Sequence, residues 1–458
     1  IGPAADTVSY GDYTETRGRK GGVSVLDGIR AAVSPETEVL YERGCNFLGQ
    51  ALHPFDPSML RDENGESGLT GHYYNGPVPQ GEPVQVRTDR TVNFNWIFAL
   101  PHPALDANCF SVVWTGSVVM PRTMDGCIGL STQDSMRLYV DDKLLIDGWG
   151  KDKSADQALD FHFEAGRTYK IRIEFVNDRR GARVIFGYSA GRENFPAAVE
   201  AARKADVAIL CMGDNEETSG ENFDRTDLNL PGRQLELVQA VYATGTPVVL
   251  VLQSGRPVTA NWENDHLPAI LEAWFPGEQG GTAIAKTLFG DAAPGGRLPI
   301  TFPRSVGQIP CHYSRRPGGG KRYVEMDWLP LYPFGYGLTY TTFAYRDMAL
   351  SRSVIDPQDT VTVSVTVTNT GKYTGDAVPQ LYVRDMFSSV VKPERQLAAF
   401  RRLTLAPGES RRVELTVGPK QLRTLGPDYV WRVEPGKFEL QLGDNAENIL
   451  LRADLTVE

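Results

Sequence analysis

Two apolar segments separated by a helical pattern constrain the fold more than any other feature of the sequence. "ADVAILCMG" at 205–213 and "TPVVLVLQSG" at 246–255 are apolar on both faces, as strands buried inside a parallel sheet must be. "LPGRQLELVQAVYATG" lies between them, with Pro near its start, apolar residues at helical spacing and Gly at its end. The alternation of strand and helix predicts right-handed crossovers and an α/β domain.

The same alternation extends in both directions along the chain. "AILEAWF" at 269–275 reads as a third strand and "GEQGGTAIAKTLFG" at 277–290 as a second helix. The segment 21–44 has the pattern of a helix followed by a strand. We therefore predict one α/β sandwich domain with a parallel-type sheet, formed by residues 1–62 and 195–340.

Residues 66–192 have a different pattern, which predicts an all-β module inserted into the α/β domain. "RTYKIRIEF" alternates apolar with charged residues, and "RLYVDDKLLID" reads as strand, turn and strand. Short alternating strands with turn signals indicate an antiparallel sandwich or barrel. Asp141 and Asp142 favour a hairpin turn, with a calcium-binding pair as the alternative. An insertion of this size is tolerated where an exposed loop has neighbouring ends.

The last segment, 343–458, predicts a third unit. In "TVTVSVTVTNTG" valines alternate with Thr and Ser, and "RRVELTV" and "KFELQLG" repeat the alternation. This pattern is typical of an immunoglobulin-like β-sandwich. The basic stretch "RRPGGGKRY" at 315–323 precedes it and favours a solvated surface loop.

Composition excludes several classes of function. The formal net charge is -10, whereas nucleic acid and anionic membranes require a basic face, so neither is expected as a partner. Apolar runs long enough for a transmembrane helix are missing from the sequence. The cysteines and histidines are scattered without metal-ligand spacing, so we expect no metal and no cofactor. A neutral or small-molecule ligand fits the charge best.

The segment "EETSGENFDR" at 216–225 holds four carboxylates directly after the first predicted strand. Ligands of open α/β sheets bind beyond the carboxyl ends of the strands, which is where this segment must lie. A solvated acidic loop is the alternative, because Asp and Glu are mostly exposed. Glu221 is the best single candidate for chemistry, since the adjacent Gly220 lets the loop approach a ligand closely.

Other candidates have simpler structural explanations. "GEQGG" at 277–281 lacks the Gly-Lys-Ser/Thr ending of a phosphate loop, so a closely packed helix N-terminus is expected. Trp96, Phe98 and Trp149 are possible sugar-stacking platforms, with buried core aromatics as the alternative.

Seven motifs follow one another along the sequence: "IGPAAD", "LDGIR", "MGDNEETSGENFDRTDLNLPGRQ", "GRPV", "AWFPGEQGG", "LFGDAAPGGRLPITFP" and "YPFGYGLTY". Together and in this order they resemble glycoside hydrolase family 3, the β-glucosidase and β-xylosidase family. "FSVVWTGSVVMP", "RLYVDDKLLID" and "EAGRTYKIRIEF" resemble an inserted PA14 domain, which implies that 66–192 is one. "LYVRD", "LAPGES" and "VEPGKFELQLG" resemble a fibronectin type III-like domain, which the likeness assigns to 343–458.

The resemblance implies a retaining hydrolase of terminal β-D-glucosyl residues with an aspartate nucleophile and a glutamate acid/base. "SGENFDR" aligns Glu221 with the family's acid/base. Asn222 departs from the family, where Gly is frequent, and should alter loop stiffness more than chemistry. Asp224 and Arg225 then support the loop, and the two glutamates at 216–217 fall outside the motif. Such an acid/base needs a pKa raised by burial and by a carboxylate about 5–5.5 Å away.

The family's nucleophile lies on an N-terminal TIM-like barrel that the resemblance does not find in this sequence. The sequence begins inside the first expected strand of the sandwich, so we expect a preceding segment or a separate chain that carries the barrel. Partners are then a β-glucoside or short oligosaccharide and that barrel, with a homodimer left open. The PA14 module is expected to form a lid in which Trp149 contacts substrate. The alternatives are a β-xylosidase, or a non-catalytic protein that binds carbohydrate through the PA14 module.

Overall fold

The computed structural model describes most of the chain and divides it into two compact units. It describes residues 1–458 except 12–13, 15–20, 48–51, 97–99, 133, 151–156, 179–181, 191–194, 216–217, 222 and 319–321. One unit consists of Ile1–Glu42 together with Val199–Glu458, and the other consists of Arg43–Ala198. The second unit is therefore inserted into the first along the chain.

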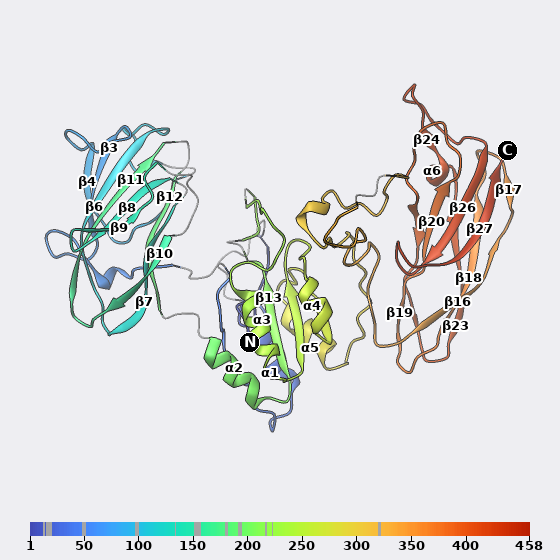
Figure 1. Ribbon diagram of the computed structural model, residues 1–458, viewed down its shortest axis with the longest axis horizontal. Helices are drawn as coiled ribbons and strands as arrows, with labels where there is room; N and C mark the ends of the chain where they lie inside the picture. Colours follow the sequence, from blue (N-terminus) through green and yellow to red (C-terminus); the bar gives the residue numbers. More distant parts are fainter. Residues whose placement is uncertain are drawn as a thin grey trace. The chain divides into compact units, whose positions relative to one another are not determined.

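The first unit contains the predicted parallel sheet (Figure 1). Its strands are β13 (Ala208–Gly213), β14 (Val248–Gln253) and β15 (Ala269–Glu272), in that order. Both pairings are parallel, which confirms the strand type expected from the continuous apolar runs. Because the strands are parallel, all three end at the same edge of the sheet. The polar residues that follow them therefore lie at that edge.

Helices pack around this sheet, and two of them approach each other very closely. The helices of this part of the chain are α1 (Val25–Ala32), α2 (Phe195–Lys204), which begins in the second unit and ends in the first, α3 (Gln234–Tyr242), α4 (Asn261–His266), α5 (Gly280–Leu288) and the short 3-10 helix η2 (Val306–Gln308). A Cβ on Gly281 would lie 1.9 Å from the carbonyl oxygen of Ser24, and one on Gly28 would lie 2.2 Å from that of Gly281. The prediction that "GEQGG" begins a closely packed helix is confirmed.

One strand predicted in this unit does not form. Residues 33–44, all of them described, follow α1 without a strand. Their backbone contacts with the rest of the unit include the bond in which Gly2 N–H donates to the Glu42 carbonyl at 3.2 Å. The apolar pattern there indicates an extended segment, but a strand also needs a partner ladder, which the pattern does not supply.

The inserted unit is all β, as predicted. One antiparallel sheet has the order β1-β12-β7-β10 with β5 on β12, and the other has the order β4-β3-β6-β11-β8-β9 with β2 on β6. Their bounds are β1 (His53–Pro54), β2 (Leu60–Arg61), β3 (Leu69–Asn75), β4 (Gln85–Asp89), β5 (Asn93–Asn95), β6 (Phe110–Val119), β7 (Met124–Thr132), β8 (Ser135–Val140), β9 (Lys143–Asp147), β10 (Gln157–Phe163), β11 (Thr168–Asn177) and β12 (Arg183–Ala190), with the 3-10 helix η1 (Pro57–Met59) before β2.

The core of the inserted unit is rich in aromatic side chains. Trp96 and Trp114 stack with ring centroids 6.4 Å apart, and Phe110 and Phe175 pack against them. Asp141 and Asp142 connect β8 to β9 with φ of 49° and 62°. Two successive residues with positive φ are typical of the tight hairpin turn that was predicted. No group of metal-ligating side chains occurs among the described residues.

The C-terminal part of the first unit is a sandwich of antiparallel sheets, as predicted. One sheet has the order β16-β18-β23, and the other β17-β27-β26-β20-β21, with β17 parallel to β27 at its edge. On β18 (Val361–Asn369) all four valines are fully buried. Burial of each valine side chain contributes about 1.5–3 kcal/mol to the free energy of folding. The other strands are β16 (Phe343–Leu350), β17 (Val354–Ile355), β19 (Gly375–Ala377), β20 (Gln380–Asp385), β21 (Gln396–Phe400), β22 (Leu403–Leu405), β23 (Ser410–Val417), β24 (Thr424–Leu425), β25 (Trp431–Arg432), β26 (Gly436–Gly443) and β27 (Ile449–Val457), and the helix is α6 (Pro419–Leu422).

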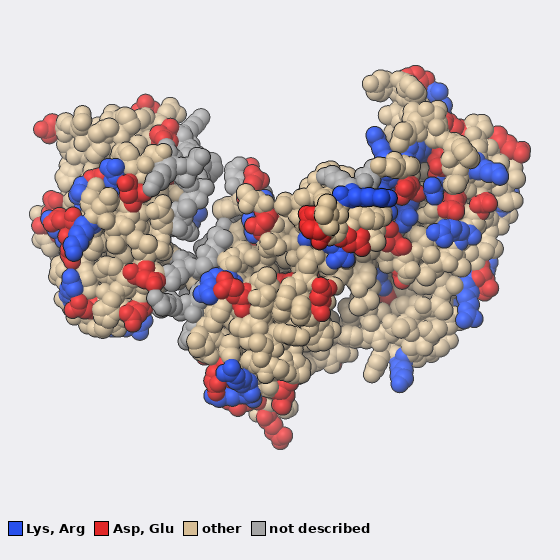
Figure 2. Space-filling view, viewed as in Figure 1, with Lys and Arg blue, Asp and Glu red and all other residues tan. Residues whose placement is uncertain are grey.

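The surface carries charges of both signs. On the face drawn in Figure 2, Lys and Arg are interspersed with Asp and Glu. Among the described helices, none is long and apolar enough to cross a membrane.

Candidate active site

The candidate site lies where β13, β14 and β15 end at one edge of the parallel sheet. Asp214 follows β13, Ser254 and Arg256 follow β14, and Glu272 is the last residue of β15. The carboxyl edge of a parallel sheet is where α/β proteins bind their ligands. Charged groups from three segments that are distant in sequence are therefore brought to one edge.

Gly213 and Gln234 fix the point at which the acidic segment leaves the sheet. The Gln234 side chain, fully buried at the start of α3, accepts from Gly213 N–H at 2.7 Å and donates to the Gly213 carbonyl at 2.9 Å. Gly213 has φ of 136°, and a Cβ there would lie 1.9 Å from the Gln253 carbonyl oxygen. Only glycine fits this close approach of β13 and β14.

Glu221 lies on a turn within the segment that follows. Phe223 N–H donates to the Gly220 carbonyl at 3.2 Å, which closes a four-residue turn with Glu221 at its second position. The Glu221 side chain is exposed, so this chain by itself does not provide the burial that an acid/base role requires. The two neighbouring glutamates at 216–217, and Asn222, lie outside the described residues.

Asp214 is the buried charge beneath this segment. It is 2% exposed and accepts from the Thr218 hydroxyl at 2.8 Å. Arg225 Nη1 lies 3.4 Å and Arg256 Nε 3.8 Å from its two carboxylate oxygens. Burial raises the pKa of Asp214, while the Thr218 hydrogen bond and the two arginines oppose that rise.

Arg225 supports the segment, but with partners other than its neighbour in sequence. It pairs with Asp214 and, at 3.5 Å, with Asp227. Its Nη2 also donates to the Asn229 carbonyl at 3.0 Å. Asp224 is exposed and forms no ion pair among the described residues. Support of the loop by Arg225 was expected; its partner was not identifiable from the motif.

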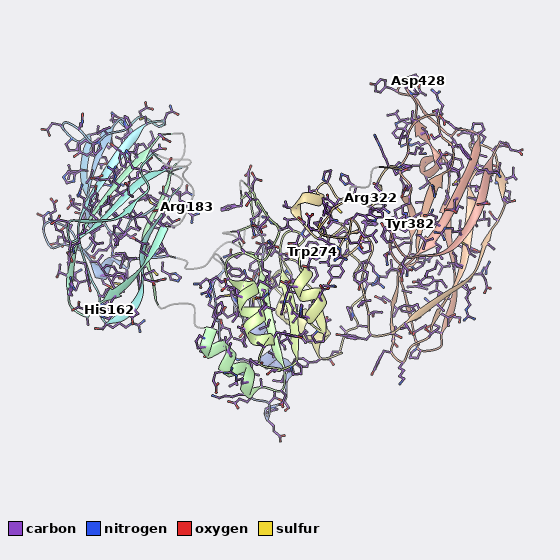
Figure 3. All side chains as sticks on the ribbon, viewed as in Figure 1. His162, Arg183, Trp274, Arg322, Tyr382 and Asp428 are labelled. Atoms are coloured by element: carbon purple, nitrogen blue, oxygen red, sulfur yellow. The ribbon has the colours of Figure 1, made fainter. Side chains whose placement is uncertain are left out.

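Glu272 adds a second carboxyl group to this edge of the sheet. Its Oε1 accepts from Trp274 N–H at 2.9 Å, and its buried Oε2 has no hydrogen-bond partner among the described residues. Burial raises the pKa of Glu272 to about 8, with a further rise caused by Asp214. Trp274, labelled in Figure 3, has φ of 53°, a rare conformation for an aromatic residue. Its ring packs edge-on against that of Phe302. The Glu272 carboxyl therefore holds a strained turn.

The three aromatic candidates, Trp96, Phe98 and Trp149, belong to the inserted unit and not to the parallel sheet. Trp96 is 9% exposed in the aromatic core of the inserted unit, so it cannot be a stacking platform. Phe98 lies outside the described residues. Trp149 is partly exposed, and the guanidinium of Arg137 lies 4.7 Å from the centre of its ring. Its contact with a substrate stays a prediction.

A pocket of about 440 Å³ lies elsewhere in the first unit. Aromatic and basic side chains line it, including Tyr313, Arg315 and Trp328. Arg315 is held by Glu447 at 2.9 Å and lies over the Trp328 ring. The lining includes no described residue of 214–225, so the pocket is separate from the candidate site. Within "RRPGGGKRY", Arg316 is exposed as expected, whereas Arg315 is half-buried.

Sequence reasoning missed Asp214, Arg256 and Glu272. Each lies at the carboxyl end of a strand that the apolar pattern had correctly predicted. The rule that ligands bind at this edge could have selected all three. The rule was applied only to the acidic segment, because an isolated Asp, Arg or Glu has no motif of its own.

A parallel α/β sheet with charged groups at its carboxyl edge, interrupted by an all-β unit and followed by a β-sandwich, defines a multidomain α/β and β protein. Comparison with known families identifies it further. Residues 1–340 match the glycosyl hydrolase family 3 C-terminal domain, and residues 377–446 match the fibronectin type III-like domain. The chain belongs to glycosyl hydrolase family 3.

Its relatives are glycoside hydrolases of more than one name. A β-glucosidase of Rhizobium radiobacter is 34% identical over 95% of this chain and 55% of its own length. A β-xylosidase of Formosa agariphila is 45% identical over 63% of this chain and 42% of its own length. The crystal structure of β-glucosidase from Kluyveromyces marxianus in complex with glucose matches with a TM-score of 0.71 and 28% identity, covering 100% of this chain and 59% of that one. The chain thus spans about half the length of the relatives it matches.

Proposed function

We propose that this chain is the C-terminal part of a retaining β-glucosidase that hydrolyses terminal non-reducing β-D-glucosyl residues. Glu221 is its general acid/base, and an aspartate on an N-terminal barrel is the nucleophile. The observation that carries this proposal is the position of Glu221 on a hydrogen-bonded turn at the carboxyl edge of the sheet, inside the segment that resembles the family's acid/base motif. Relatives named β-glucosidase that align with 95% of the chain support it.

The exposure of Glu221 defines what the barrel must supply. A general acid that later acts as a base needs a pKa near the working pH, which requires burial and a nearby carboxylate. In a retaining enzyme that carboxylate lies about 5–5.5 Å away and attacks the anomeric carbon. Both conditions are met only when the barrel covers the turn, so activity requires the barrel.

In the proposed reaction Glu221 acts twice. It first donates its proton to the glycosidic oxygen while the barrel aspartate forms a bond to the anomeric carbon and the leaving group departs. It then removes a proton from water, whose oxygen attacks the anomeric carbon and releases the aspartate. The configuration at the anomeric carbon is retained because it is inverted twice.

Chemical rescue tests the role of Glu221. In the full-length enzyme with its barrel, Glu221→Ala should lower hydrolysis of a dinitrophenyl β-glucoside, whose deglycosylation step has lost its base. Azide, which needs no base, should restore turnover and give β-glucosyl azide. An exposed acid outside the motif, Glu278, provides the matched control, and Glu278→Ala should keep full activity. An unchanged rate for Glu221→Ala on a natural disaccharide would overturn the assignment.

A β-xylosidase of the same family is the second candidate, favoured by the Formosa relative. Comparison of kcat/KM for matched aryl β-glucosides and β-xylosides decides between them. A higher value for the xyloside would replace the proposed substrate without changing the role of Glu221. A non-catalytic carbohydrate-binding protein would hydrolyse neither.

We assign the domains along the predicted bounds, an α/β sandwich of 1–62 and 195–340, an inserted PA14 domain of 66–192 and a fibronectin type III-like domain of 343–458, with one change. Because β1 and β2 pair with strands of the inserted sheets, the inserted domain starts before residue 53 and not at 66. The compact all-β unit Arg43–Ala198 and its two antiparallel sheets support the inserted domain. The alignment of the Kluyveromyces enzyme with 100% of this chain also favours an insertion shared with that relative.

Within the inserted domain we assign Trp149 as a substrate contact. Its indole is partly exposed with a guanidinium on its ring, an arrangement that leaves polar and aromatic surface for a sugar. Trp149→Ala should raise KM about tenfold with little change in kcat. Trp431 is the control, because it is exposed and likewise carries a guanidinium, that of Arg423, at 4.5 Å from the centre of its ring. Equal effects of the two substitutions would remove the assignment.

A further inference from the structure

We infer that Arg256 is a positioning residue that holds the acid/base turn in its working conformation from both sides of Glu221. This inference rests on the proposed function of Glu221. In the proposed reaction Arg256 contacts neither substrate nor the reacting atoms, and it acts only through the turn.

The geometry of the Arg256 guanidinium carries the inference. Its Nη2 donates to the Thr218 carbonyl at 3.1 Å, three residues before Glu221. Nη1 and Nη2 each lie 3.4 Å from the Phe223 carbonyl, two residues after Glu221. One planar group therefore ties together the two backbone segments between which Glu221 lies.

Arg256 is itself fixed by contacts from two directions. Its Nε lies 3.8 Å from Asp214 Oδ2, which neutralises its charge at a position where it is only 22% exposed. The Ser254 hydroxyl donates to the Arg256 carbonyl at 2.7 Å and fixes the backbone after β14. The ion pair with Asp214 and the fixed backbone thus restrict where the guanidinium can lie before any ligand arrives.

The segment after β14 is also pressed closely against the acid/base segment. A Cβ on Gly255 would lie 2.6 Å from the Ser219 hydroxyl and 2.9 Å from the Phe275 ring. A larger residue at this position would push the two segments apart. The absence of a side chain brings the Arg256 backbone near enough for its guanidinium to reach both carbonyls.

The chemical consequence concerns proton transfer. A general acid raises the reaction rate about 10²–10⁴-fold, and displacing it by about 1 Å can lower the rate about 10²-fold. Loss of Arg256 should free the turn and move the Glu221 carboxyl out of line with the glycosidic oxygen. The loss should be large for a poor leaving group that needs a proton, and small for one that leaves as a stable anion.

The experiment compares two substrates in the full-length enzyme with its barrel. For phenyl β-glucoside, Arg256→Ala should lower kcat/KM about 10²-fold; for dinitrophenyl β-glucoside the loss should be less than about threefold. Arg256→Lys keeps the positive charge but loses the planar guanidinium that reaches two carbonyls at once. Its kcat/KM for phenyl β-glucoside should therefore lie between those of Arg256→Ala and the parent enzyme. The control Arg203→Ala changes an exposed arginine of α2 and should leave both values unchanged.

A double variant separates positioning from a merely structural role. If Arg256 acts through Glu221, Arg256→Ala should cause no further loss on phenyl β-glucoside when Glu221→Ala is already present. Equal losses on both substrates, or additive losses in the double variant, would overturn the inference. Should Arg256→Ala not fold, Arg256→Lys is compared in the same way.

The two proposals fail in distinguishable ways. If the loss of kcat/KM in Glu221→Ala is the same for phenyl and dinitrophenyl β-glucoside, the acid/base role of Glu221 is itself wrong. If the loss in Glu221→Ala is larger for phenyl β-glucoside but the loss in Arg256→Ala is equal for both substrates, only the inference about Arg256 is wrong.

Discussion

Two buried aspartates, one in the inserted unit and one at the edge of the parallel sheet, show how differently the same side chain is used. Asp89 is 5% exposed and accepts short bonds from Tyr73 Oη at 2.5 Å, Arg87 Nε at 2.7 Å and Trp114 Nε1 at 2.8 Å. Asp214 is 2% exposed, and its two arginines lie 3.4 and 3.8 Å away.

The difference lies in what the partners do besides touching the carboxylate. The partners of Asp89 are side chains of one sheet, and Tyr73 and Trp114 are fully buried. The arginines around Asp214 also donate to the backbone carbonyls of Thr218 and Asn229, within and just after the segment 216–225. Asp89 therefore stabilises a core, whereas Asp214 organises the loop that carries Glu221.

The largest expected effect is on the Asp89 side of the comparison. Asp89→Ala leaves two buried donors and the Arg87 charge unpaired, so we expect a loss of about 3–5 kcal/mol in the free energy of unfolding. Urea unfolding followed by tryptophan fluorescence measures it. In the same sheet, Asp147 is 46% exposed and pairs with Arg137, and Asp147→Ala should cost less than about 1 kcal/mol. Similar losses for the two variants would refute the structural role of Asp89.

A pH-dependent effect is expected near Asp214, because Glu272 lies there. The pKa of Glu272 is about 8 in the folded chain against an ordinary value of 4.5. Between these values the folded chain keeps a proton that the unfolded chain has lost, so the contribution of Glu272 to stability is present below pH 4.5 and is lost as pH rises to about 8.

Glu272→Gln tests this, since Gln cannot ionise. The variant should match the parent chain at pH 4 and exceed its free energy of unfolding by about 2 kcal/mol at pH 8, a value reduced because the side chain is only partly buried. Unfolding curves across this pH range measure the difference, with Glu278→Gln as the exposed control. A difference that does not change with pH would contradict the prediction.

The smallest expected effect sharpens the comparison directly. Asp214→Asn keeps an acceptor for Thr218 but removes the charge that faces Arg225 and Arg256. We therefore expect the free energy of unfolding to fall by about 1–2 kcal/mol. Amide hydrogen exchange at Thr218, Ser219 and Phe223 should become about tenfold faster. Asp89→Asn should leave these three amides unchanged. If both variants speed exchange there equally, Asp214 has no special hold on the loop.

Much of the fold could be predicted because its signals are local. The apolar runs at 205–213 and 246–255 became β13 and β14, and the valine alternation on β18 became a buried face. The strand expected before residue 44 did not form, because strand formation depends on a partner that a single segment cannot specify.

The sequence by itself determined the strand and helix types, the family and the candidate Glu221, because periodicity and motif order are properties of neighbouring residues. Only the tertiary structure decided that Asp214, Arg256 and Glu272 lie at one edge, that Arg225 pairs with Asp214, and that one guanidinium reaches both sides of Glu221. The physical reason is that a parallel sheet brings the ends of distant strands to one edge, where burial and charge create interactions that no single segment encodes.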